Sequence, residues 1–189
     1  MEKKNIKTVV ITFAVMFAVI FLFRSFRSVG FGEAGVYFKT FGGGVVTDEP
    51  PKGEGLRFVL PWDDLYIYNV KQQEVFESKM KVLSSNGLDI LLDITVLYQP
   101  VYNELGLLHQ TKGFNYVDVV IKPALRAISR SVVGNYTPEQ LYSTKRDAIE
   151  SEIEERLVEN VQSQHVQINE VLVRDVTLPA NIKAAIERK

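Results

Sequence analysis

The longest apolar stretch of the chain lies near its N-terminus, where residues 8–23 contain no charged residue, proline or glycine. Together with its flanks, a helix of this length approximately crosses a hydrocarbon core of about 30 Å. The stretch is apolar on all sides, whereas a core helix of a soluble domain normally keeps one polar face. The pattern therefore predicts one transmembrane helix. Its membrane-facing side chains would be Val9, Val10, Ile11, Phe13, Val15, Phe17, Val19, Ile20, Phe21, Leu22 and Phe23.

Basic residues flank this stretch, in a tail over residues 1–7 and directly after Phe23. Lys7, Arg24 and Arg27 are expected at the interface, where long side chains place their charges beside the headgroups. A cleaved signal peptide is the main alternative, but Arg24 and Arg27 stand where its small cleavage-site residues would lie. A membrane hairpin would need a proline or glycine near its middle. More positive charges precede the span than follow it, which favours a cytoplasmic N-terminus and an exported body.

A period of two follows the span and predicts strands rich in β-branched and aromatic residues. Asn86-Gly87 predicts a two-residue hairpin between two of these strands. In the strand over 88–98, Asp89 and Asp93 fall on the polar face and are expected to be solvated. The predicted strands cover residues 36–41, 56–60, 65–70, 74–80, 81–84, 88–98 and 166–176.

The second half of the chain changes to helical spacing. Residues 115–134 place an apolar face on a helix or helix pair, with Pro123 marking a break or kink. Thr137-Pro138-Glu139-Gln140 predicts a capped helix start. The helix that follows has a predicted buried stripe and a run of charged residues that is expected to be solvated. The stripe is Leu141, Ile149, Ile153, Leu157 and Val161, and the charged run is Glu150, Glu152, Glu154, Glu155 and Arg156.

The composition narrows the function classes. The net charge is −1 and there is no cysteine, so the chain lacks the basic excess of a nucleic-acid-binding domain and cannot form disulfides or cysteine-based metal sites. The segment Gly30–Gly35 matches a dinucleotide fingerprint, but a membrane stretch precedes it and a predicted strand follows it. Gly42, Gly43 and Gly44 indicate a turn, with no lysine of a phosphate loop after them.

Candidate catalytic and modification residues are few. His109 and His165 lie outside any motif typical of hydrolases, and exposure at element ends is the expected outcome for both. Asn135 begins a formal glycosylation sequon, but Thr137 already serves as a predicted helix cap. Trp62 is expected either at headgroup level or as a core side chain. The residues therefore predict no catalytic site, metal site or cofactor.

Four segments, in order, resemble the prohibitin/stomatin (Band 7, SPFH) family, and most closely prohibitin-like membrane proteins. They are GEGLRFVLPWDDLYIYNVKQQE at Gly53–Glu74, Tyr98-Gln99-Pro100, IKPALRAISRSVVGNYTPEQL at Ile121–Leu141, and VLVRDVTLPANIKAAIERK at Val171–Lys189. The resemblance implies an α+β fold in which an SPFH/Band 7 domain over 28–178 follows the transmembrane helix. It also implies that residues 179–189 begin a long C-terminal helix or coiled coil. The expected oligomer-facing residues of that helix are Ile182, Ala185 and Ile186.

The resemblance further implies a scaffold rather than an enzyme. Copies would assemble into rings or cages that organise membrane microdomains and regulate membrane proteins, including membrane-bound AAA proteases. A monomeric exported ligand-binding domain on a single-span tether is the first alternative, and a hydrolase is the second. Since the N-terminus lacks an amphipathic Arg- and Ser-rich presequence, a bacterial inner membrane is the favoured location, with the mitochondrial inner membrane as the alternative.

Overall fold

The computed structural model describes residues 2–178, and it describes the side chains of residues 8–142 and 145–178. The chain forms two compact units, Met1–Val70 and Lys71–Lys189. Each unit has its own antiparallel sheets, which together with the helices confirm the predicted α+β class. The predicted C-terminal helix with Ile182, Ala185 and Ile186 lies outside the described residues.

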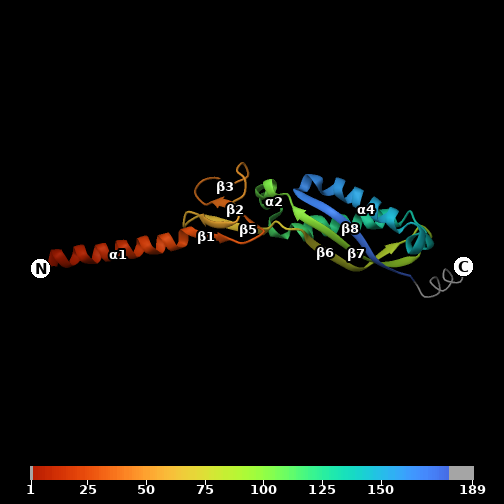
Figure 1. Ribbon diagram of the computed structural model, residues 1–189, viewed down its shortest axis with the longest axis horizontal. Coiled ribbons are helices and arrows are strands. Elements are labelled where there is room, and N and C mark those ends of the chain that lie inside the picture. The colour runs from red at the N-terminus through yellow and green to blue at the C-terminus, as the bar shows by residue number, and fades with distance from the viewer. Residues whose placement is uncertain (1, 179–189) are drawn as a thin grey trace. The chain divides into compact units, whose positions relative to one another are not determined.

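The first unit consists of one long helix and two small sheets (Figure 1). Helix α1 (Glu2–Ser25) leads directly into strand β1 (Phe26–Val29), which pairs with β4 (Gly55–Phe58). The second sheet has the order β3–β2–β5, formed by Gly44–Val45, Glu33–Lys39 and Asp64–Asn69. Strands β2, β4 and β5 confirm three predictions with shifted ends. Strands β1 and β3 were not predicted, because the apolar run hides the short pattern of β1 and because β3 begins within the predicted glycine turn.

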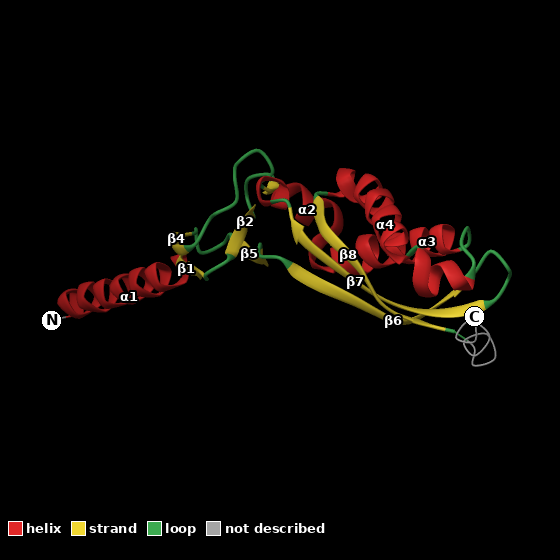
Figure 2. Ribbon diagram, turned by 45° about the vertical axis from the view of Figure 1, so that its right-hand side comes forward, coloured by secondary structure: helices red, strands yellow, loops and turns green. Residues whose placement is uncertain are grey.

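The second unit is a three-stranded antiparallel sheet covered by helices on one face (Figures 1 and 2). Its order is β6–β7–β8, formed by Gln73–Leu83, Asp89–Pro100 and Val166–Thr177. Helix α3 (Lys122–Val133) contacts β6 and α4, and helix α4 (Arg146–Val161) contacts β8. The sheet therefore has two different edges, one at β6 beside α3 and the other at β8 beside α4.

Shorter helical segments complete the second unit. Helix α2 (Leu105–Lys112) was not predicted, because eight residues are too few to display a helical period clearly. A π-helical turn, Val117–Ile121, immediately precedes Pro123 in the first turn of α3, which confirms the predicted irregularity. The remaining segments are the 3₁₀ turns Tyr102–Glu104, Gly113–Asn115 and Gln162–Gln164, and a second π turn, Gln140–Thr144.

The hairpin between β6 and β7 corrects three predictions. Leu83 pairs with Asp89, so five residues rather than two lie between the paired positions, and Gly87 has a positive φ of 75°. The two strands predicted over 74–84 form one strand with a bulge between Glu77 and Met80. Asp93 is half-buried rather than solvated, because its Oδ1 accepts a hydrogen bond from the Lys79 backbone N–H at 2.6 Å. That bond satisfies a donor in the bulge.

The capping prediction at Thr137 is confirmed in both directions. The Thr137 N–H donates to Gln140 Oε1 at 2.9 Å, and the Gln140 N–H donates to Thr137 Oγ1 at 3.4 Å. The helix is interrupted at Lys145, whose φ is −128°, before α4 begins. All five predicted stripe residues are buried, at 2% exposure or less, and form much of the core between α4 and the sheet.

The charged residues of α4 are not simply solvated, which corrects that prediction. Glu150 accepts a hydrogen bond from the Val173 N–H at 2.9 Å, and Glu154 accepts one from the Val171 N–H at 3.2 Å. Arg146 donates to the carbonyls of Val173 and Arg174. The helix thus satisfies the outward backbone groups of the edge strand β8, which would otherwise be free to pair with another chain.

Candidate membrane interface

Helix α1 places the predicted anchor residues on a surface that the protein does not cover. Residues 8–25 form a helix that is long and apolar enough to cross a bilayer, and only 6% of that window is buried. Phe17 is 69% exposed and Phe23 is 80% exposed. Of the predicted anchor side chains, only Phe21 is half-buried. Exposure of such apolar side chains to water is unfavourable, so the surface needs an apolar environment.

The junction between α1 and β1 is fixed by hydrogen bonds rather than by a linker. Ser25 is fully buried, and its Oγ donates to the Phe21 carbonyl at 2.8 Å. Its own carbonyl accepts a hydrogen bond from the Val59 N–H at 2.7 Å, next to the end of β4. The end of the helix is therefore tied to both strands of the β1–β4 ribbon.

The β1–β4 ribbon has one apolar face and one basic face. Phe26 lies opposite Phe58, and their rings meet edge to face with centroids 5.8 Å apart. Leu56 shares this face because side chains alternate along a strand, and all three side chains are exposed. Arg27 and Arg57 lie opposite each other on the other face. A two-stranded ribbon with these faces matches the boundary between acyl chains and headgroups.

Trp62 extends the exposed aromatic surface from the helix to the glycine turn. Its ring lies 5.9 Å from that of Phe21 and 6.2 Å from that of Phe41. Trp62 is 45% exposed, so it is not a buried core residue. A hollow of about 290 Å³ lies beside it, lined by Phe17, Ile20, Phe21, Arg24, Pro61 and Trp62. Tryptophan next to the end of a span is typical of a membrane–water interface.

Asp63 holds the Trp62 loop in place from the protein side. This carboxylate is buried and accepts hydrogen bonds from the Tyr37 hydroxyl at 2.6 Å and the Thr40 N–H at 2.9 Å. Burial, followed by the hydrogen bond to Asp63, raises the pKa of Tyr37. The Thr40 hydroxyl donates to the Trp62 carbonyl. These hydrogen bonds of Asp63 and Thr40 therefore hold the loop that carries Trp62.

The predicted interfacial charges have different surroundings. Arg24 and Arg27 are exposed, and within the described part of the chain neither side chain forms a hydrogen bond or an ion pair. Arg57, which the sequence did not indicate, donates to the carbonyls of Gly53 and Glu54. Lys7 lies on α1, and its side chain is outside the described set. Two arginines at the end of the span are thus available to anionic groups.

The glycine-rich segment is used for packing and turns rather than for phosphate binding. A strand, β1, does precede Gly30, which corrects one expectation, but the element after the segment is strand β2 and not a helix. The N–H groups of Gly30 and Gly32 donate to the carboxylates of Glu33 and Glu54. A Cβ on Gly35 would lie 2.7 Å from the Leu65 side chain. Carboxylates at these amides would repel a phosphate, so the fingerprint does not mark a nucleotide site.

The two histidines belong to the second unit and are separate residues with separate partners. His109 packs edge to face on Phe114, and burial lowers its pKa. His165 Nδ1 lies 2.8 Å from Glu104 Oε2, a His–carboxylate pair that is partly exposed. Among the described residues, no serine or threonine hydroxyl bonds to His165. The pair links the turn before α2 to the start of β8.

The sequence predicted the apolar helix but missed the aromatic surface beside it. Phe26, Phe31, Phe41, Leu56 and Phe58 are all exposed in the first unit. Two signals were present: large apolar residues that alternate with arginine after the span, and phenylalanines within glycine-rich turns, where a core residue has no reason to lie. The pairing of Phe26 with Phe58 across thirty-odd residues had no local signal.

The chain is similar to one described family and to several known proteins. Residues 27–189 match the SPFH domain / Band 7 family. A relative named prohibitin-4, mitochondrial, from Arabidopsis thaliana is 25% identical over 94% of the chain and 62% of its own length. Prohibitin-2, mitochondrial, of the same plant is 28% identical over 72% of the chain and 47% of its length. Prohibitin-2 of Xenopus tropicalis is 26% identical over 84% and 52%. The chain thus spans about half to three-fifths of the length of these relatives.

Proposed function

The chain belongs to the SPFH domain / Band 7 family, and on that premise we propose that it is a single-span membrane scaffold whose copies assemble side by side into rings or cages. The observation that carries this proposal is the continuity of two lipid-matched surfaces in the first unit. Helix α1 runs without a linker into an amphipathic ribbon with an exposed aromatic face. The ribbon and the Trp62 loop lie at headgroup level, and the second unit makes contacts with neighbouring proteins.

This arrangement supports lateral organisation better than simple tethering. A tether for a ligand-binding domain needs only the span, whereas the ribbon fixes the direction in which the chain leaves the bilayer. A fixed direction lets the first units of many copies lie in one plane, as closed symmetric assembly requires. The enclosed partners are membrane proteins, of which membrane-bound AAA proteases are the class implied by the resemblance to prohibitins.

Particle size tests the scaffold directly. The protein is extracted from its membrane in mild detergent and examined by mass photometry and electron microscopy. Rings or cages of many copies are the expected result, and co-purifying membrane proteins identify what they enclose. A clean monomer or dimer would instead favour the tethered ligand-binding domain. The His109→Ala and His165→Ala variants should leave every function intact, because the scaffold uses no catalytic residue.

Trp62 tests the membrane position of the ribbon, because it is the only tryptophan in the chain. In lipid nanodiscs containing brominated acyl chains, its fluorescence is expected to be strongly quenched. If only a water-soluble agent quenches Trp62, the loop lies in solvent, and the proposed position of the ribbon at the interface is wrong. The α1 span would remain in that outcome, so the two membrane contacts are tested separately.

Two inner membranes are candidate locations. The charge balance around the span supports a body on the exported side, and the relatives named mitochondrial add support to the mitochondrial membrane beside the bacterial one. Protease accessibility in sealed vesicles of both orientations tests the side. Protection of the second unit in right-side-out vesicles would overturn the exported placement.

A further inference from the structure

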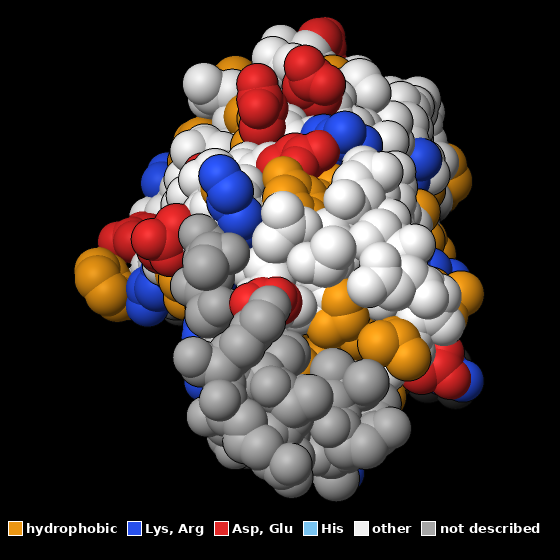
Figure 3. All heavy atoms as spheres, turned by 90° about the vertical axis from the view of Figure 1, so that its right-hand side faces the viewer, with side chains coloured by type: hydrophobic (Ala, Val, Ile, Leu, Met, Phe, Trp, Pro, Cys, Tyr) orange, Lys and Arg blue, Asp and Glu red, His pale blue; other side chains and the backbone are white. Residues whose placement is uncertain are grey.

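The two edges of the second unit carry opposite charge. The basic edge consists of β6 and α3 and carries Lys79, Lys81, Arg126 and Arg130. The acidic edge consists of α4 and carries Asp147, Glu150, Glu154 and Glu155 beside β8. Because the sheet order is β6–β7–β8, these edges lie on opposite sides of one sheet. In Figure 3, carboxylate side chains are visible at the top of the view and further ones at its left.

Part of the charge on the basic edge is already neutralised within the chain. Arg126 forms a two-pronged contact with Glu77, at 3.0 Å from Nη2 to both carboxylate oxygens, and Lys81 pairs with Asp89 at 2.7 Å. Among the described residues, the charged ends of Lys79 and Arg130 form no ion pair. Two cations on this edge therefore remain available to an external anionic surface.

The acidic edge has a matching surplus. Glu150 and Glu154 are occupied by the backbone N–H groups of β8, and Arg146 by its carbonyls. Asp147 and Glu155 are exposed and have no ion-pair or hydrogen-bond partner in the described part of the chain. Val158 is exposed on the same side of α4, three residues after Glu155. This edge thus presents two free carboxylates and, towards the C-terminal end of α4, an apolar side chain.

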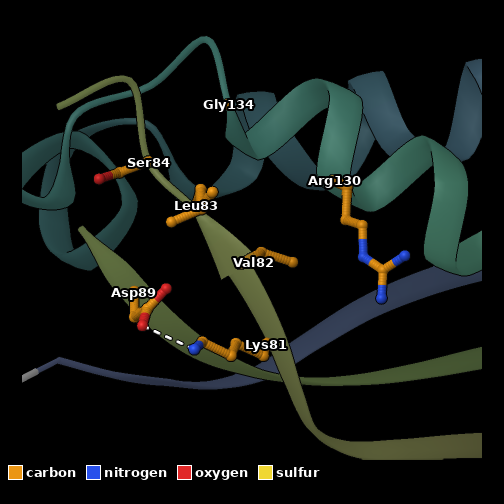
Figure 4. A pocket seen from close by; sticks show the side chains of 7 residues that line it. All are labelled: Lys81, Val82, Leu83, Ser84, Asp89, Arg130 and Gly134. Carbon is orange, nitrogen blue, oxygen red and sulfur yellow. Dashed lines mark ion pairs between the residues drawn. The ribbon is translucent and has the colours of Figure 1, made fainter. Parts of the chain in front are cut away.

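The basic edge has a hollow at the end where β6 and α3 finish. A pocket of about 510 Å³ is lined by Lys81, Val82, Leu83, Ser84, Asp89, Arg130 and Gly134 (Figure 4). Arg130 extends from α3 beside the strand that carries Lys81 and Val82 (Figure 4). Leu83 is 55% exposed there. An edge with carboxylates and an apolar side chain is complementary to this hollow in both charge and polarity.

Neither edge is suited to pairing strands with a neighbour. The side chains of α4 satisfy the outward groups of β8 near Val171 and Val173. On β6, the bulge between Glu77 and Met80 and the lysines at 79 and 81 disrupt the template that an open edge would offer. Contact between copies must therefore use side chains, which is where the charge complementarity lies.

We propose that the basic edge of one copy binds the acidic edge of the next copy, so that the second unit forms a head-to-tail interface. The occupant of each edge is a second copy of this chain. Such a heterologous contact repeats around a ring, whereas an isologous contact would stop at a dimer. The inference rests on the proposed scaffold function and names the surfaces through which assembly proceeds.

Site-directed crosslinking tests the interface in native membranes, because the chain contains no cysteine of its own. Ser78→Cys labels the basic edge beside Lys79, and Ser151→Cys labels the acidic edge between Asp147 and Glu155; both serines are exposed. A short bismaleimide should link the double variant into a ladder of multimers, but neither single variant. A mixture of the two single variants should give dimers only. Ser163→Cys, twelve residues beyond Ser151 and also exposed, is the matched control and should replace Ser151→Cys without forming a ladder.

Each result has a distinct meaning. Dimers from either single variant would show an isologous contact and overturn the proposal. An assembly of many copies without a ladder from the double variant would also overturn it, while leaving the scaffold function intact. A wild-type protein that stays monomeric in the membrane would reject the scaffold function itself. As a second measurement, Arg130→Glu or Glu155→Arg should each reduce multimers about tenfold, because each brings like charges together. The combined variant should restore the multimers, because opposite charges then face each other again.

Discussion

The two units of the chain use large apolar side chains in opposite ways. The second unit buries Ile90, Ile94, Leu125, Ile153 and Leu157 between one sheet and its helices. The first unit exposes Phe26, Phe31, Phe41, Leu56 and Phe58 beside an exposed apolar helix. Hydrophobic surface in the second unit is therefore matched within the chain, whereas in the first unit it stays exposed and, as we propose, faces lipid. The same residue types stabilise the fold of the second unit and, as we propose, the membrane position of the first unit.

The largest expected effect is in the core of the second unit. Leu157→Ala removes a fully buried side chain of α4 and should lower the free energy of unfolding by about 2–5 kcal/mol. Val158→Ala changes the next residue, which is 39% exposed, and should cost less than about 1 kcal/mol. Denaturant unfolding of the detergent-solubilised protein measures both. Equal losses for the two variants would show that α4 does not pack as the structure has it.

A substitution in the aromatic surface of the first unit should change location instead of stability. Phe58→Glu places a charge on the apolar face of the ribbon and removes about 2 kcal/mol of favourable burial in lipid. Quenching of Trp62 by brominated lipids should fall, while the unfolding of the second unit stays unchanged. Ser28→Glu lies on the same face of the ribbon, opposite Leu56, without removing an aromatic ring. If Ser28→Glu and Phe58→Glu reduce quenching alike, charge rather than ring burial sets the position.

The contrast between the units also separates what the sequence could predict. The stripe from Leu141 to Val161 repeats at helical spacing, and all of it is buried. Period alone sufficed there because the stripe stays buried on both sides of the interruption at Lys145. Strand β1 has four residues beside a span, and α2 has eight residues, so neither displays enough turns or alternations to stand out. The bulge at Ser78 and Lys79 broke the alternation of β6 and made one strand read as two.

The candidate site was predictable only where its residues are consecutive. The apolar helix α1 could be predicted from composition, since it is one continuous apolar run. The facing of Phe26 and Phe58 depends on a strand pairing that no local pattern encodes. Glu150 and Glu154 likewise had the spacing of an exposed helix face. Their partners are backbone N–H groups in a strand seventeen or more residues away, and hydrogen bonds of this kind leave no trace in residue type.

A smaller effect is expected where α4 protects the edge of β8. Glu150→Ala removes the acceptor for the Val173 N–H and should cost about 1 kcal/mol of stability. Glu155→Ala removes an exposed carboxylate of the same helix and should leave stability nearly unchanged. Hydrogen exchange should show faster exchange at Val173 in the first variant and not in the second. Unchanged protection at Val173 would mean that another group covers the edge.

The smallest effect is a pH dependence that the second unit should show and the first should not. His109 on α2 has a lowered pKa because burial disfavours its charged form. The unfolded chain then binds the proton more tightly, so stability is full above the ordinary pKa of 6.5 and declines as the pH falls towards the folded-state value. His109→Gln should abolish the part of this decline that begins near pH 6.5. Unfolding measured between pH 7.5 and about 5.5 keeps most carboxylates ionised and isolates the histidine. Trp62 fluorescence, which reports on the first unit, should remain constant over the same range, and a parallel change there would mean that the two units do not respond separately.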